Sequence, residues 1–72
     1  MKYYHVSINL ICPVEFQGLR IMELVVKAQN RIEACTEAIH TYRLAVPDTL
    51  KALDLEIGEV CDVTEAIEEL LL

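Results

Sequence analysis

The sequence predicts a small α+β domain in the order β-β-α-β-α, with a three-stranded antiparallel sheet and helices packed on one face. Three observations support this fold class. Residues 4–12 alternate strictly between apolar and polar side chains, residues 30–45 show helical apolar spacing, and a second alternating segment follows Pro47. A chain of 72 residues makes one domain with a thin core, so we treat residues 1–72 as a single domain.

The first two predicted strands are residues 4–12 and residues 19–28. The first strand has apolar residues at every second position, which is typical of a half-buried strand. Pro13 ends it because proline lacks an amide donor, and Gly18 can supply a positive φ in the connection. The second strand has one apolar face and one mixed face, and the mixed face contains Ile21, Glu23, Val25 and Lys27. A hairpin is the simplest pairing of these two strands.

The predicted helix begins after Asn30 and runs to about Ala45. Asn30 is a favourable N-cap, and Glu33 three residues later matches a variant of the capping box. Pro47 ends the helix, since the residue before a proline is disfavoured in the helical conformation. The side chains predicted to face the sheet are Ile32, Cys35, Ile39 and Tyr42, with Ala38 beside them.

A third strand is predicted within residues 53–63, where apolar and acidic side chains alternate. Gly58 indicates either a bulge or a close approach of another backbone. A short last helix, residues 65–71, begins after Asp62 or Thr64, either of which could cap it.

The right-handed crossover rule predicts the strand order 2-1-3, with the first strand in the centre. Both outer strands then have a free edge. Asp54 and Glu56 discourage further pairing on the third strand, whereas little beyond Glu23 and Lys27 protects the second. We therefore expect the second strand to be the exposed edge.

The charge divides at Pro47. Residues 1–47 carry four acids and five bases, a net charge of +1, whereas residues 48–72 carry eight acids and one base, a net charge of −7. An acidic surface of this kind attracts a basic partner and repels nucleic acid and anionic membranes. We therefore predict a protein partner with a basic surface, no direct nucleic-acid binding and no membrane partner.

Catalytic and metal-binding signatures are not visible in the sequence. The three cysteines lack a C-x-x-C spacing, their odd number excludes a complete set of intramolecular disulfides, and each is interpreted as a small buried apolar residue. Asp54 and Glu56 share a strand face, but a solvated strand edge does not provide the desolvated pocket that acid–base catalysis needs. Two glycines are too few for a phosphate-binding loop. We expect no enzyme, no metal and no cofactor.

The start of the chain lacks the apolar run of a secretion signal, and no segment reaches the roughly 20 apolar residues of a membrane span. The sequence therefore predicts an intracellular, cytoplasmic protein. With 54% hydrophobic residues, it also predicts more apolar surface than such a small core can hide. The alternative is an ordinary monomer with scattered exposed leucine and valine side chains.

Two functions follow from these features. The first is a non-enzymatic interaction module whose acidic residues occupy a basic groove of a partner: Asp54, Glu56, Glu59, Asp62, Glu65, Glu68 and Glu69. In size, acidity and lack of chemistry, the chain resembles the small accessory inhibitors of phages and mobile elements, including anti-CRISPR proteins and nucleic-acid mimics, although no motif carries this resemblance. The same acids could instead serve only to keep an apolar protein in solution.

The second function is self-association into a structural or assembly protein, most simply a homodimer. Its predicted contact residues lie on the outer face of the second strand and at the apolar end of the chain: Ile21, Glu23, Val25, Lys27, Leu70, Leu71 and Leu72. Ile67 belongs to the same apolar end. The terminal leucines could equally fold back onto the core of their own chain.

Overall fold

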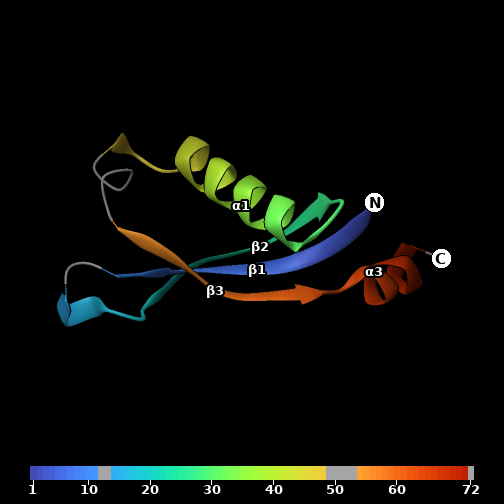
Figure 1. The fold of residues 1–72 in the computed structure, drawn as a ribbon, viewed down its shortest axis with the longest axis horizontal. Coiled ribbons are helices and arrows are strands. Elements are labelled where there is room, and N and C mark those ends of the chain that lie inside the picture. Colours follow the sequence, from blue (N-terminus) through green and yellow to red (C-terminus); the bar gives the residue numbers. More distant parts are fainter. Residues whose placement is uncertain (12–13, 49–53, 72) are drawn as a thin grey trace.

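The computed structural model describes residues 1–11, 14–48 and 54–71 of the chain. Three strands form one antiparallel sheet in the order β2-β1-β3 (Figure 1). The elements in chain order are β1 (Lys2–Leu10), a short 3-10 helix η1 (Val14–Phe16), β2 (Arg20–Ala28), α1 (Arg31–Ala45), β3 (Leu55–Asp62) and α3 (Thr64–Leu71). The predicted α+β class, element order and strand order are confirmed.

β1 and β2 form the predicted hairpin. Val6 lies opposite Leu24 and Ile8 opposite Met22, so apolar residues of both strands share one face of the sheet. Gly18 has φ = 85°, the left-handed conformation expected of a glycine in this connection. The register shifts by one residue after Ile8, and this bulge makes Ile21 the additional residue of β2.

Helix α1 begins and ends where the sequence predicts. Asn30 is the N-cap, and its side-chain Oδ1 accepts a hydrogen bond of 2.9 Å from the backbone N–H of Glu33. Val46, which precedes Pro47, is extended, and its N–H donates to the carbonyl of Tyr42 at 3.2 Å. The helix therefore stops at the residue that the proline excludes from helical geometry.

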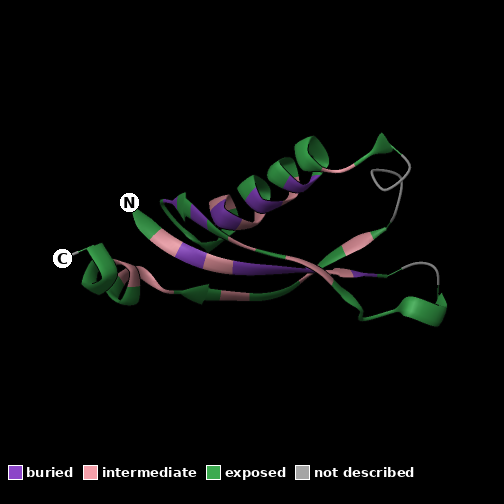
Figure 2. Cartoon of the chain, turned by 180° about the vertical axis from the view of Figure 1, so that it is seen from behind, coloured by how far each residue is buried: buried purple, intermediate pink, exposed green. Residues whose placement is uncertain are grey.

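The face of α1 that meets the sheet agrees with the prediction in part. Ala38 and Tyr42 are buried as predicted, whereas Ile32 is 82% exposed and Ala34 is buried in addition. The three buried residues are spaced by four, and the two alanines allow the helix backbone to lie close to the strands. Cys35 and Ile39 are half-buried beside them. Burial is concentrated on β1 and on the side of α1 that faces it (Figure 2).

β3 contains the irregularity that Gly58 predicts. Val60 lies opposite Val6 and Ile57 opposite Ile8, so β3 has one residue more than β1 over this interval. The backbone N–H of Glu59 donates a hydrogen bond of 2.8 Å to Oγ of Ser7, which is fully buried. A Cβ atom at position 58 would lie 2.6 Å from that same Oγ. Gly58 therefore provides both the bulge and the close approach.

Helix α3 follows β3 almost directly and lies beyond the end of the sheet (Figure 1). α1 contacts all three strands, while α3 contacts β1 and has no buried residue. The molecule is elongated, with extents of 42 × 21 × 20 Å. The hairpin end with η1 and the α3 end lie at opposite ends of the long axis (Figure 1).

Candidate interaction surfaces

The acidic residues selected from the sequence are all exposed. They follow one another along the β3 edge of the sheet and continue onto α3, so the fold arranges them as a strip rather than as a compact cluster. We call this set the acidic strip: Asp54, Glu56, Glu59, Asp62, Glu65, Glu68 and Glu69. Within β3 the strip uses both faces of the sheet, because Glu56 lies opposite Asn9 whereas Asp62 lies opposite the buried Tyr4. The charge therefore follows the edge of the sheet, which suits an extended basic surface.

Two members of the acidic strip have a basic partner within the chain. Glu59 Oε1 lies 3.7 Å from Arg20 Nη2, and Asp62 Oδ2 lies 3.8 Å from Lys2 Nζ. The other five members form no ion pair with any residue that the structure describes. Exposed pairs of this length contribute little to stability, so most of the negative charge is available to a partner.

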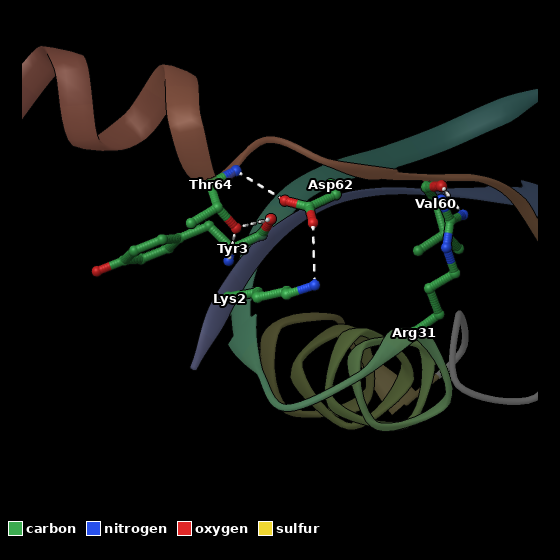
Figure 3. Close-up of polar contacts among 6 residues, drawn as sticks. All are labelled: Lys2, Tyr3, Arg31, Val60, Asp62 and Thr64. Carbon is green, nitrogen blue, oxygen red and sulfur yellow. Dashed lines mark hydrogen bonds and ion pairs between the residues drawn. The ribbon is translucent and has the colours of Figure 1, made fainter.

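Asp62 lies at the joint between β3 and α3, shown in Figure 3. Its Oδ1 accepts a hydrogen bond of 3.0 Å from the backbone N–H of Thr64, the first residue of the helix. Thr64 Oγ1 accepts from the N–H of Tyr3 at 2.9 Å, and the N–H of Val63 donates to the Tyr3 carbonyl at 2.9 Å. Of the two predicted capping residues, Asp62 accepts from the first amide of the helix, whereas Thr64 is itself the first helical residue. Asp62 satisfies a free amide of α3, and Thr64 attaches that end of the helix to β1.

The pKa of the Asp62 carboxyl is lowered from its ordinary value of 3.8. The main cause is hydrogen bonding by Thr64, first through its hydroxyl and then through its backbone N–H, and the charges of Lys2 and Arg31 add to it. Arg31 is held near this joint because its Nη1 donates to the carbonyl of Val60 at 2.7 Å (Figure 3).

Asp62→Asn is expected to destabilise the protein in a pH-dependent way. A carboxyl with a lowered pKa in the folded state stabilises the fold above its unfolded pKa, and loses that contribution as the pH falls through the folded value. The stability difference between wild type and variant should therefore be constant at neutral pH and shrink below about pH 3.8. Urea unfolding at a series of pH values measures it. An unchanging difference down to the lowest pH would contradict the role of the ionised carboxylate.

The leucines at the end of α3 do not fold back onto the core. Leu70 is 82% exposed and Leu71 is 74% exposed, whereas Leu72 lies outside the described residues. Ile67 is half-buried. The end of α3 therefore presents apolar side chains next to the acidic ones.

Three of the residues predicted for self-association on β2 are exposed: Glu23, Val25 and Lys27. Ile21 differs from the prediction, because at the bulge it packs against the buried core cluster. Glu23 Oε1 lies 2.8 Å from Arg20 Nη1 and 3.4 Å from His5 Nε2, all on one face of the sheet.

The hairpin end carries an apolar surface that the sequence analysis did not identify. Val14 is 76% exposed, Phe16 is 55% exposed and Leu19 is 52% exposed. The signal was present in the sequence, because Val14 and Phe16 are bulky apolar residues in the predicted connection and Leu19 comes directly after it. An aromatic and two aliphatic side chains in a connection are candidates for a contact surface.

The described residues contain no group of three His, Cys, Asp or Glu side chains placed to hold a metal ion. Cys35 and Cys61 are free, and Cys61 is exposed on the edge strand β3, so its interpretation as a buried apolar residue is wrong. Cys12 lies outside the described residues. None of the helices described has the length and apolar character needed to cross a membrane. A search of family models, curated proteins and solved structures finds no match to this chain.

Proposed function

We propose that this protein is a non-enzymatic protein-interaction module whose acidic strip binds a basic surface on a protein partner. The supporting observation is that every member of the strip is exposed and that five members have no ion pair among the described residues. Most of these carboxylates are carried by a hydrogen-bonded strand and a helix, so the backbone that holds their charge is ordered before the partner arrives.

Electrostatics sets the class of partner and the way it binds. A net charge of −7 over residues 48–72 repels phosphate backbones, so the complementary surface is one rich in lysine and arginine. Such a surface is found in grooves that bind nucleic acid, and a protein that occupies the groove excludes the nucleic acid. An inhibitor of the phage accessory type would act in this way in the cytoplasm.

The test is a comparison of two variants with the same change in net charge. E65Q/E68Q/E69Q removes three charges from the strip, and E15Q/E33Q/E37Q removes three charges outside it. Proteins retained by immobilised wild type and released by salt are identified and purified, and their affinity for each variant is measured. We expect the strip variant to bind about tenfold more weakly or worse, chiefly through a slower on-rate, and the control to bind nearly as wild type does.

Equal losses in the two variants would mean that net charge alone attracts the partner and that the strip is not its binding site. Unchanged binding by the strip variant, together with lower solubility, would mean that these acids serve to keep the protein in solution. Either result contradicts the proposal.

The second candidate function is self-association, and a separate observation favours it. Helix α3 has no buried residue although Leu70 and Leu71 are part of it, and β2 is a sheet edge that carries the exposed Val25. A copy of the chain could cover either surface. Self-association through β2 is compatible with the first candidate because β2 and β3, which carries the strand part of the acidic strip, lie at opposite edges of the sheet.

A further inference from the structure

The backbone of β2 has a defined outward side. Leu10 of β1 accepts a hydrogen bond from Gly18 N–H and donates one to the Leu19 carbonyl. The backbone N–H and C=O groups of the even-numbered residues of β1 therefore point toward β2. On the other side of β1, Val63 N–H donates to the Tyr3 carbonyl, so the backbone groups of the odd-numbered residues of β1 point toward β3.

The observed register shows which residues of β2 have backbone groups that point toward β1 and which have them pointing away. Leu24 and Val26 lie opposite Val6 and Tyr4, which face β2, so these two residues of β2 bond to β1. The backbone N–H and C=O groups of the residues between and beside them point away from the sheet. These residues are Glu23, Val25 and Lys27.

We infer that this edge pairs with the same edge of a second copy, antiparallel and about a two-fold axis at Val25. This inference rests on the self-association candidate and specifies its contact. In this register Val25 lies opposite Val25 of the second copy, and Glu23 lies opposite Lys27 of the second copy, twice by symmetry. Glu23, Val25 and Lys27 all have outward backbone groups in both copies, so the pairing forms up to about six backbone hydrogen bonds.

Charge complementarity selects this register over its neighbours. A two-fold axis at Glu23 would oppose two glutamates directly, which destabilises a strand pair. An axis at Leu24 or at Val26 also opposes outward-facing residues, but it places neither Glu23 nor Lys27 against the opposite charge. Only the axis at Val25 pairs both charges of the edge and puts its exposed valine against an apolar side chain.

The side chains are available for these contacts. Val25 is 48% exposed on the face of the sheet that α1 does not cover. The two ion pairs of Glu23 with described residues both involve Oε1, so Oε2 is the oxygen that would accept from a lysine. Lys27 Nζ lies 5.6 Å from the centre of the Tyr3 ring, a contact that leaves its three hydrogen-bond donors for a carboxylate.

The resulting dimer would have one continuous six-stranded sheet with β3 at both outer edges. Each acidic strip would then lie at an outer end of the assembly. The dimer would present two strips to a partner, and two linked sites bind a repeated basic surface more tightly than one.

The test uses charge reversal and its rescue, with the solution mass measured by light scattering during gel filtration. The wild type should run as a dimer of the 8.2 kDa chain. Lys27→Glu opposes two glutamates on each side of the axis and should weaken the dimer about tenfold or more. The double variant E23K/K27E restores opposite charges at both places and should return the dissociation constant to within about threefold of wild type.

A proline variant tests the backbone pairing without depending on charge. The N–H of Val25 points away from β1, so Val25→Pro removes an outward donor while the hairpin keeps its own hydrogen bonds. We expect a folded monomer with an unchanged circular dichroism spectrum. A folded proline variant that still dimerises would overturn the proposed edge pairing.

Other outcomes distinguish the failure of the β2 edge pairing from the failure of self-association as a whole. A wild type that stays monomeric at millimolar concentration overturns both self-association and the edge pairing. A dimer that is insensitive to Lys27→Glu and to Val25→Pro, but is lost in L70E/L71E, shows self-association through α3 and overturns only the edge pairing. A dimer that Lys27→Glu weakens but that E23K/K27E does not restore overturns the register.

Discussion

Replacing Tyr42 with alanine should remove a large part of the stability of this protein. Tyr42 is 2% exposed and is the largest of the fully buried side chains, packed among residues of β1, β2 and α1. Truncation of a large buried aromatic residue costs roughly 3–5 kcal/mol. A domain of this length has a total stability of about 4–11 kcal/mol, by scaling per residue. Urea unfolding followed by circular dichroism should show a much lower midpoint, or no folded baseline.

The matched control is Leu44→Ala on the same helix. Leu44 is 73% exposed, so its truncation also removes apolar atoms from α1, although fewer than that of Tyr42, and a surface substitution of this kind changes stability by only about 0.5 kcal/mol. Similar midpoints for the two variants would mean that α1 does not pack on the sheet through Tyr42. That result would contradict the core described above.

Strand order could be predicted because several independent constraints agreed. Strict alternation in residues 4–12 identified a strand, and the right-handed crossover left one economical arrangement of three strands. Asn30 and Pro47 bounded the helix through local chemistry that does not depend on the rest of the fold. Local rules of this kind transfer from sequence to structure with little loss.

The face of α1 that packs on the sheet was predictable only in part, because Ala38 and Tyr42 are buried as predicted whereas Ile32 is not. The apolar residues of α1 surround the helix, since Ile32 and Leu44 are exposed while Ala34 and Ala38 are buried. A count of large apolar residues favours Ile32, but close packing against a sheet selects small residues that allow the backbone to approach. Which face of α1 packs on the sheet depends on the shape of the sheet surface, and the spacing of apolar residues in the helix alone does not reveal that shape.

For the candidate surfaces, charge was a better guide than hydrophobicity. The acids of the strip are exposed as expected, because an unpaired carboxylate is costly to bury. Ser7 is one of the polar residues in the alternating segment 4–12, yet it is fully buried, and the backbone N–H of Glu59 at the β3 bulge donates to its Oγ. A bulge changes which residues share a face, and sequence spacing alone gives its presence but not its register.

That bulge supplies the second large effect, which is the cost of Gly58→Ala. A Cβ at this position would lie 2.5 Å from Asn9 Nδ2 and 2.6 Å from Ser7 Oγ. Ser7 is fully buried and accepts the N–H of Glu59, so it cannot move away without losing that hydrogen bond. Overpacking of this kind costs roughly 1–3 kcal/mol. The free energy of unfolding in urea, compared with that of wild type, measures the cost.

A double-mutant cycle with Asn9→Ala isolates the steric cause. Oδ1 of Asn9 is buried without a hydrogen-bond partner among the described residues, so its removal forfeits little. The alanine removes the clash with the Asn9 side chain and leaves the clash with Ser7 Oγ. The cost of Gly58→Ala should therefore fall by about 1 kcal/mol in the Asn9→Ala background. Gly18→Ala is the contrasting control, because its cost arises from φ = 85° with no neighbour within 4 Å and should not depend on Asn9. Strictly additive costs for positions 9 and 58 would show that the bulge does not bring these residues together.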